Sequence, residues 1–559
     1  MSSTSSWKET AIYHIYPRSF QDTDGDGIGD LPGITRRLGH IRDLGAGAIW
    51  MGPVFPSPQV DYGYDISDYR DIDPLFGTLD DMEALIDRAH DLGLKVLLDL
   101  VLNHTSDRHP WFREALKEPD GPYGDYYFFR DPAAGGGPPN NWRSFFSIPA
   151  WTFVEERRQY YLHLFAPEQP DLNWDNPAVR EEMSGIANFW LAKGVDGFRL
   201  DVINMISKIP GLPSLVDGRR SGVFIDGPKI LEYLQEFRRS LKTDKALVLV
   251  GETPGVTPEA ARAYTDPANR ALDMVLLFDH LEVDHGPSGR WEPRVWSVAD
   301  LAGVVSRWQD QLSAPSWPSI YLSNHDQPRV VSRYGNDADY RFQSATALAT
   351  VFYLQRGTPI VYQGEEIGMK NFPLESPNQI LDIETKNAYL DLVGAKGLSE
   401  GEAMERIRRE ARDNSRTPMQ WSDAKNAGFS DAKPWYPPNP DFRRWNVAAQ
   451  QADPKSVLAY YRELLSFRQR TPALIYGDYE HVAPAPDSKG TVFAFRRRRM
   501  PSDRLLVAAN LSDAPATWRL PEEESRSLPT LRLLFGNYAA PTAGTGTLAL
   551  RPWEAVVLA

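Results

Sequence analysis

The sequence contains no cysteine, which excludes disulfide bonds and thiolate metal sites. No apolar run approaches the ~18 residues of a membrane-spanning helix, and the opening residues, MSSTSSWKET, carry no apolar signal segment. Basic residues are in the minority, with 61 Lys and Arg against 75 Asp and Glu and a formal net charge of −14. Nucleic acid and membrane partners are therefore not expected, and we expect a cytoplasmic protein.

A length of 559 residues is too great for one hydrophobic core, so we expect two or three domains. Apolar residues make up 42% of the chain and charged residues 24%, an ordinary globular composition. Aromatic residues are plentiful, with 16 Trp, 24 Tyr and 24 Phe. Sugar-binding clefts use such side chains as stacking platforms, but composition alone is more typical of large cores.

One stretch of the chain shows how predicted helices and strands alternate. Thr78 is placed to cap a helix from Leu79, with Asp81 as its capping-box partner. Apolar residues then recur on one helical face as far as Gly93, which is placed to end the helix. Residues 94–101, LKVLLDLV, form the nearly continuous apolar run of a strand buried on both faces.

The same order recurs along the chain. Asn176 and Pro177 open a predicted helix that Gly194 closes before the strand VDGFRL, and Asp453 and Pro454 open another helix. Repeated helix-then-strand units imply an α/β fold with a parallel sheet, either doubly wound or closed into a (β/α)8 TIM barrel. Polar residues directly after the strands favour the barrel, whose site lies at the carboxyl ends of its strands.

Two segments depart from this alternation. Residues 105–173 are rich in Gly, Pro, Asn and aromatics and predict an inserted, loop-rich subdomain B. Residues 475–559 contain short strand-like runs and predict a C-terminal antiparallel β-sandwich, in which we interpret the basic run Arg496–Arg499 as an exposed strand and turn. The barrel then takes residues 1–104 and 174–474.

Polar clusters directly follow four of the apolar strand runs. They are Asp99, Asn103 and His104 in DLVLNH, Arg199 and Asp201 in GFRLD, Glu252 after ALVLVG, and His325 and Asp326 in SIYLSNHD. A single acidic residue at a strand end is more often a helix cap or a structural hydrogen-bonding group. Four clusters in the same context indicate a site, because a barrel brings all its strand ends to one face.

These stretches resemble the signature regions of the α-amylase family of glycoside hydrolases. DLVLNH, GFRLDVIN, VGETPG and YLSNHD match four regions in chain order, and QPDLNW at residues 169–174 matches a fifth. The oligo-1,6-glucosidase and α-glucosidase branch is the most similar, over essentially the whole chain. The resemblance implies the barrel, the inserted subdomain and the β-sandwich.

The resemblance also implies catalytic roles. Asp201 matches the nucleophile, Glu252 the general acid/base, and Asp326 the third carboxylate, which holds sugar hydroxyls and favours a distorted ring. Arg199 lies two residues before Asp201, so in a strand both side chains point the same way, and its charge should keep Asp201 ionised. A retaining glycosidase needs two carboxyls about 5–5.5 Å apart and no catalytic metal or organic cofactor.

Further residues match the positions that hold the sugar. His104 and His325 match hydroxyl-binding residues, and Phe165 and Gln169 match residues that line the pocket. In exo-acting members a segment like DYGYDISDY supplies an Asp and a Tyr for the terminal glucose, here Asp61 and Tyr64. An arginine in RDNSRTPMQW pairs with that Asp in the same branch, and we assign it to Arg412 rather than Arg416.

The residue after the nucleophile bears on linkage preference. In this branch Val at that position accompanies α-1,6 cleavage, whereas Thr or Ala accompanies maltases. Val202 therefore favours α-1,6 over α-1,4 linkages.

An acidic loop near the N-terminus has the composition of a hard-cation site. DTDGDGIGD places carboxylates at alternate positions with glycines between them, but it lacks the glutamate that ends an EF-hand loop. The resemblance implies a structural Ca²⁺ ion, and an unoccupied acidic turn is the alternative. Its ligands would be Asp22, Asp24, Asp26, the Ile28 carbonyl and Asp30.

The sequence thus predicts a retaining exo-α-glucosidase that releases terminal α-linked glucose from short oligosaccharides, as a monomer or homodimer. The alternative is an α-glucosyltransferase or sucrose-converting enzyme on the same scaffold. Sucrose isomerases carry an Arg-Leu-Asp-Arg-Asp stretch near the aglycone, where this chain has FDHLEVDHG at residues 278–286. A non-catalytic transporter partner is disfavoured, because the three carboxylates are present.

Overall fold

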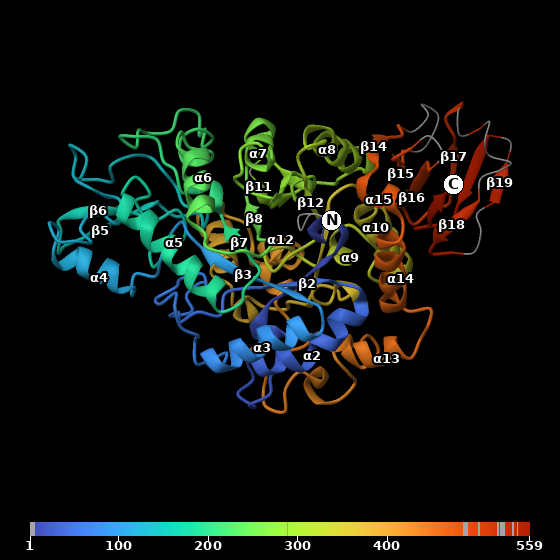
Figure 1. Ribbon diagram of the computed structural model, residues 1–559, viewed down its shortest axis with the longest axis horizontal. Coiled ribbons are helices and arrows are strands. Elements are labelled where there is room, and N and C mark those ends of the chain that lie inside the picture. Colours follow the sequence, from blue (N-terminus) through green and yellow to red (C-terminus); the bar gives the residue numbers. More distant parts are fainter. Residues whose placement is uncertain are drawn as a thin grey trace.

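The computed structural model describes residues 6–287, 289–483, 490–500, 503–522, 525, 532–538, 542–544 and 546–559. Figure 1 shows the chain in three parts placed side by side. A small subdomain of short strands lies at one end, a barrel of strands and helices lies in the middle, and a sandwich that holds the C-terminus lies at the other end.

Eight short strands form the central sheet: β1 (Ile12–Ile15), β2 (Ala48–Met51), β3 (Lys95–Val101), β7 (Gly197–Asp201), β8 (Val248–Glu252), β9 (Met274–Leu276), β12 (Ser319–Tyr321) and β13 (Thr358–Tyr362). Their order is β12-β13-β1-β2-β3-β7-β8-β9, and every neighbouring pair is parallel. The two edge strands meet where the Ser319 hydroxyl donates to the Val275 carbonyl at 2.7 Å. The predicted (β/α)8 barrel is confirmed.

Side chains at alternate strand positions face opposite sides of the sheet. Ile12, Leu97 and Val248 pack together in one buried cluster supplied by several barrel strands. Their chain neighbours Tyr13, Leu98 and Leu249 belong to a larger cluster shared with the surrounding helices. Both faces of the strands are therefore buried, which is why the strand segments are continuous apolar runs.

Helices cover the outside of the barrel. None within the described residues combines the length and the apolarity needed to span a bilayer. The longer ones are α2 (Leu31–Leu44), α3 (Leu79–Asp91), α5 (Pro177–Ala192), α6 (Ile230–Ser240), α7 (Pro258–Thr265), α8 (Val298–Gln311), α10 (Arg341–Tyr353) and α14 (Val457–Gln469). Shorter ones are α1 (Ser6–Glu9), α9 (Val330–Arg333), α13 (Val447–Gln451) and α15 (Pro472–Tyr476).

Most of the predicted helix starts are confirmed. Thr78 and Asp81 form a reciprocal capping box at α3, and the Asn176 side chain caps α5. The prediction that Asp453 opens the last long helix is wrong by one turn. Asp453 lies in the turn before α14, and the Ser456 hydroxyl caps that helix instead. Both residue types are good caps, so the pattern alone did not distinguish them.

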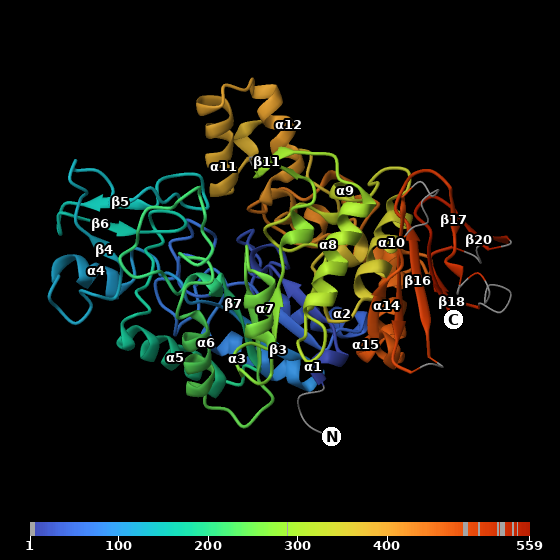
Figure 2. The same ribbon diagram turned by 90° about the horizontal axis from the view of Figure 1, so that it is seen from above.

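Two excursions leave the barrel at its strand ends. The first follows β3 and contains α4 (Pro110–Lys117) and an antiparallel sheet of β4 (Phe129–Arg130), β5 (Trp151–Val154) and β6 (Gln159–Leu162), within the range expected for subdomain B. The second follows β13 and carries α11 (Ile383–Leu390) and α12 (Glu400–Glu410), which stand out from the barrel in Figure 2. The sequence did not single out the second excursion.

Two antiparallel sheets form the C-terminal part. One has the order β14-β15-β16-β21-β18 and the other β17-β20-β19. Trp518 and Leu548 from the small sheet pack with Val492, Leu506 and Val556 from the large one, so the predicted sandwich is present. Part of the expected range 475–559 lies outside the described residues. The bounds are β14 (Asp478–His481), β15 (Val492–Arg498), β16 (Leu505–Asn510), β17 (Ala516–Arg519), β18 (Leu533–Gly536), β19 (Thr542–Gly544), β20 (Thr547–Leu550) and β21 (Ala555–Leu558).

The sequence predicts that the basic run Arg496–Arg499 is exposed, but one of its arginines is buried. Arg497 is fully buried, and its guanidinium donates to the carbonyls of Leu354 and Leu474 at 2.7 Å and of Gly477 at 2.8 Å. These carbonyls follow α10 and lie in and after α15. Arg497 therefore connects the sandwich to the barrel, because it donates to carbonyls that helix ends leave without a partner in the helix.

The close approach of β7 to β8 provides a test of this packing. A methyl group on Gly197 would lie 2.3 Å from the Val248 carbonyl oxygen, whereas one on Gly303 in the middle of α8 would meet nothing within 4 Å. We expect Gly197→Ala to destabilise the barrel by about 1–3 kcal/mol through overpacking. Gly303→Ala, the matched control, should leave stability unchanged or raise it by ~0.5–1 kcal/mol. Scanning calorimetry checks both, and an equal midpoint for the two variants would contradict the packing described.

Candidate active site

A cavity of about 170 Å³ opens at the carboxyl ends of the barrel strands. It is lined by all the predicted catalytic and sugar-binding residues except Arg199 and His325, which contact lining carboxylates from beneath. The sequence-predicted residues thus come together at one place. Those on the cavity wall are Asp61, Tyr64, His104, Phe165, Gln169, Asp201, Glu252, Asp326 and Arg412.

The centre of the site is one guanidinium among three carboxyls. Asp201 ends β7 and Glu252 ends β8, and β7 pairs with both β3 and β8. Arg199 Nη1 lies 2.6 Å from Asp201 Oδ1 and 2.7 Å from Asp99 Oδ1, and its Nη2 lies 2.6 Å from Glu252 Oε1. All four side chains are buried. The two-residue spacing in β7 therefore directs Arg199 and Asp201 to the same face.

Burial raises the pKa of Asp201 well above its ordinary value; Arg199 lowers it, and the carboxyls of Glu252 and Asp99 raise it further. The sequence predicts that Arg199 keeps Asp201 ionised; its charge does lower this pKa, but burial and the neighbouring carboxyls outweigh it. One guanidinium thus serves three buried carboxyls, whose titrations are linked. Such a group can present a carboxylate and a carboxylic acid at the same time.

Tyr64 and His325 form the layer beneath the carboxyls. The Tyr64 hydroxyl lies 3.0 Å from Asp99 Oδ2 and 2.8 Å from His325 Nε2, and the two rings stack with centroids 5.3 Å apart. His325 Nε2 also lies 3.1 Å from Asp326 Oδ2. Burial raises the pKa of Asp326, but His325 and Arg412 outweigh it, so the pKa falls well below the ordinary value and Asp326 is a carboxylate.

The far wall of the cavity is an ion pair. Arg412 Nη2 lies 2.8 Å from Asp61 Oδ1, so the structure places Arg412 and not Arg416 against Asp61. Gln169 Nε2 contacts the other Asp61 oxygen at 3.2 Å and His104 Nε2 at the same distance. Arg416 contacts Asp326 instead, at 2.8 Å. The cavity is thus closed on this side by buried, mutually satisfied polar groups.

Val202 has an unusual backbone. Its φ is 36°, in the left-handed region that β-branched residues avoid, and its N–H donates to Glu252 Oε2 at 3.0 Å. Its side chain lines the cavity. Strained backbone of this kind persists only where the surrounding structure holds it in place, which is common at functional sites.

Several residues of the site were missed in the sequence. Glu384 and Arg290 line the cavity, the first from α11 and the second from β11 (Gly289–Pro293), which pairs with β10 (His285–Gly286). Asp382 lies behind the wall in contact with both Arg412 and Arg416. None of them follows a barrel strand, so the strand-end signal that identifies the other residues does not apply to them.

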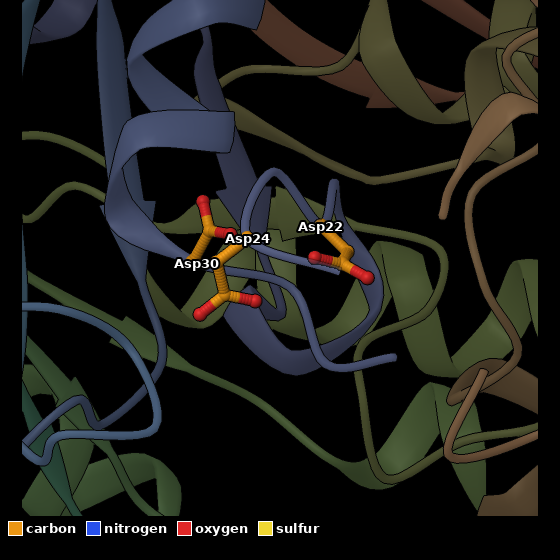
Figure 3. A group of neighbouring side chains, drawn as sticks. All are labelled: Asp22, Asp24 and Asp30. Carbon is orange, nitrogen blue, oxygen red and sulfur yellow. The ribbon is translucent and has the colours of Figure 1, made fainter. Parts of the chain in front are cut away.

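The acidic loop lies apart from this cavity. One carboxylate oxygen from each of Asp22, Asp24 and Asp30 lies within 4.8 Å of the others. Figure 3 shows these three side chains on the loop. Asp26 is not in that group; its carboxylate accepts the Ile28 N–H at 2.7 Å. The set is all oxygen, with Asp22 and Asp30 buried and Asp24 exposed, which fits a hard cation.

A parallel barrel that carries buried carboxyls at its strand ends, on the wall of a cavity, has the arrangement of a barrel enzyme. The profile of the alpha amylase catalytic domain matches residues 14–477, and the chain belongs to the alpha-amylase family of glycoside hydrolases. The family and the class of enzyme predicted from the sequence are confirmed.

Individual members of the family are similar to this chain over almost its whole length. The chain is 46% identical over 558 residues to an oligo-1,6-glucosidase from Parageobacillus thermoglucosidasius, covering 99% of this chain and 98% of that protein. A trehalose-6-phosphate hydrolase structure from Bacillus licheniformis superposes with a TM-score of 0.94, and an isomaltulose synthase structure from Klebsiella sp. LX3 with 0.93. Each structure shares 38% identity with this chain, and each superposition covers 99% of both chains.

The carboxyl group around Arg199 gives a prediction for pH dependence. The charge of Asp99 raises the pKa of Asp201, so Asp99→Asn should lower that pKa. The predicted nucleophile then stays ionised down to a lower pH, so the acidic limb of the pH profile of kcat/KM should move to lower pH. Hydrolysis of p-nitrophenyl α-glucoside measures it. Asp196→Asn, at another buried carboxylate just before β7, should leave the limb unmoved; equal shifts in the two variants would refute the prediction.

Proposed function

We propose that this chain is a retaining, exo-acting α-glucosidase that removes terminal α-linked glucose from short oligosaccharides and prefers α-1,6 to α-1,4 linkages. The observation that carries the proposal is the carboxyl pair Asp201 and Glu252, held by Arg199 at the wall of a cavity that Asp61 and Arg412 close. The carboxyl pair supports the hydrolytic reaction, and the closed cavity supports cleavage at the end of a glucan chain.

In this mechanism Asp201 attacks the anomeric carbon and forms a covalent glucosyl ester. Glu252 gives its proton to the departing oxygen and then, as a base, takes one from the water that cleaves the ester. The Val202 N–H, 3.0 Å from Glu252 Oε2, orients that carboxyl. Asp326 is a carboxylate and would bind hydroxyls of the same ring, which favours the distorted, positively charged transition state.

Exo action follows from the shape of the cavity. Asp61, Arg412 and Gln169 lie on its wall, where Arg412 and Gln169 both donate to Asp61, so a glucan chain cannot continue past them. Asp61 and Arg412 would hold the hydroxyls of a terminal glucose. Phe145, Phe146 and Phe278 also line the cavity and offer apolar surface to a sugar ring.

The preference for α-1,6 linkages rests on Val202 and on relatives named oligo-1,6-glucosidase at 44–46% identity. A sucrose-converting enzyme is the second candidate, because the isomaltulose synthase structure has the same fold. The two differ in whether water or a sugar hydroxyl cleaves the ester. The missing arginine stretch at residues 278–286 supports hydrolysis.

We also propose that the acidic loop binds a structural Ca²⁺ through Asp22, Asp24, Asp26, the Ile28 carbonyl and Asp30. The convergence of three of these carboxylates supports it. The ion would offset their mutual repulsion and hold the loop that leads into α2. The cytoplasmic location and the choice between monomer and homodimer stay predictions.

Product analysis tests the proposed reaction. Incubation with isomaltose, maltose, sucrose and panose should release glucose faster from isomaltose than from maltose, and NMR should show α-glucose as the first product. Asp201→Asn should lower kcat at least about a thousandfold, because the ester cannot form. Faster release from maltose would overturn the linkage preference, β-glucose as the first product would overturn retention, and isomaltulose from sucrose would favour the second candidate.

Chelation tests the calcium site. Removing Ca²⁺ with EGTA should lower the midpoint of thermal unfolding by several degrees, since a ligand that binds only the folded state stabilises it. Re-adding Ca²⁺ should restore the midpoint. Asp24→Ala should abolish this response, whereas Asp43→Ala, at an exposed acid elsewhere, should retain it. A midpoint that does not depend on Ca²⁺ in the unaltered protein would rule the site out.

A further inference from the structure

Asp382 lies just outside the cavity and divides its two oxygens between two tasks. Oδ1 accepts the N–H and the hydroxyl of Thr385 at 2.8 and 2.9 Å, which caps α11. Oδ2 accepts Arg412 Nε at 2.9 Å, Arg412 Nη2 at 2.7 Å and Arg416 Nη1 at 3.0 Å. The side chain is fully buried and is not part of the cavity wall. One oxygen therefore serves the helix and the other serves both arginines.

The two arginines extend from Asp382 to the carboxylates that face the sugar. Arg412 continues to Asp61 at 2.8 Å and to Asp326 Oδ1 at 3.2 Å. Arg416 continues to the same Asp326 oxygen at 2.8 Å. Asp382 is thus the shared anchor of two ion-pair chains that end on different parts of the glucose site.

The charges in this buried cluster show why the anchor matters. Two guanidiniums lie among Asp61, Asp326 and Asp382, and both already form ion pairs with one Asp326 oxygen. Burial opposes the charge on Asp382, but Arg412 and Arg416 outweigh it and hold its pKa below the ordinary range. Without this carboxylate Arg416 would keep only Asp326 as an ion-pair partner among the described residues, and Arg412 would keep Asp61, Asp326 and, at 3.4 Å, Glu384. A buried cation without its partner is costly, so we expect them to move toward the sugar-facing carboxylates.

We propose that Asp382 is a positioning residue that fixes Arg412 and Arg416, and through them the orientation of Asp61 and Asp326 toward the glucose ring. It does not touch the substrate. The inference rests on the proposed function, in that the bound ring is a terminal glucose. A purely structural role, as the cap of α11, is the alternative.

Asp382→Asn separates these two roles. Asparagine keeps an oxygen that can cap α11, but it removes the negative charge from between the arginines. Asp413→Asn is the matched control. Asp413 is buried in the same region and holds the same loop, but its hydrogen bonds come from the backbone N–H groups of Leu381 and Asp382. The same chemical change is thus made in two neighbouring acids, of which one contacts the arginines.

Two measurements report on glucose recognition. For p-nitrophenyl α-glucoside, Asp382→Asn should lower kcat/KM on the order of 100-fold, mainly through kcat, because Asp326 acts most strongly on the distorted ring. Calorimetric binding of deoxynojirimycin, a glucose-shaped cation, should weaken by a similar factor. Asp413→Asn should stay within about threefold of the unaltered protein in both, and both variants should melt within a few degrees of it.

A double-mutant cycle shows whether Asp382 acts through the arginines. Arg412→Gln combined with Asp382→Asn should lose much less activity than the product of the two single losses, because the second change removes a contact that has already gone. Multiplicative losses would overturn the proposal, as would equal losses for Asp382→Asn and Asp413→Asn. Rates and binding unaltered in Asp382→Asn would also overturn it.

The outcome for Asp382 is independent of the linkage that the enzyme prefers. If the unaltered protein binds deoxynojirimycin but releases no glucose from isomaltose or maltose, the proposed function fails while the binding comparison still decides the role of Asp382. If it hydrolyses isomaltose and Asp382→Asn does so equally well, the proposed function stands and the inference is wrong.

Discussion

The site depends on the ion pairs that the Arg199 guanidinium forms with Asp99, Asp201 and Glu252, at 2.6–2.7 Å. The buried guanidinium here has only carboxyls as ion-pair partners, and three buried carboxyls are costly without a cation, so neither side is stable alone. The barrel makes the arrangement possible, because β3, β7 and β8 are adjacent and parallel and bring four side chains from three chain segments to one point. The cluster has more acidic than basic groups, and the pKa of Asp201 lies well above its ordinary value.

A second cluster of buried arginines and carboxylates forms the sugar-binding side of the site. Arg412 and Arg416 lie among Asp61, Asp326 and Asp382, again with more carboxylates than guanidiniums. One ion-pair cluster supplies the reacting groups, and the other closes the cavity and meets the ring. His325 and Tyr64 lie between the two, because Tyr64 contacts Asp99 and His325 contacts Asp326. The two clusters therefore form one continuous buried polar network inside an apolar barrel.

Much of this could be predicted from the sequence, for identifiable reasons. Strands buried on both faces are apolar runs, and a site residue at a strand end interrupts the run with a polar letter, as Asp201 and Glu252 do. Motif resemblance added roles to these positions. Asp382 and Arg497 could not be found in this way. Asp382 lies in an excursion with no strand-end signal, and Arg497 sits in a basic run that gives no sign of the helix-end carbonyls that it satisfies. Their partners are far away in the chain, and only the folded structure identifies them.

Val202 combines three properties in one residue. Its side chain lines the cavity, its N–H reaches Glu252, and its φ of 36° lies in a region that valine avoids. A residue chosen to reshape the aglycone side would also change how easily this backbone is held, and thus the position of the donor to the acid. Given the proposed role of Val202 in linkage preference, selection for a new linkage and selection for rate would act on the same peptide unit. An evolutionary path from one sugar linkage to another would need compensating changes around residue 202, because strain and specificity are inherited together there.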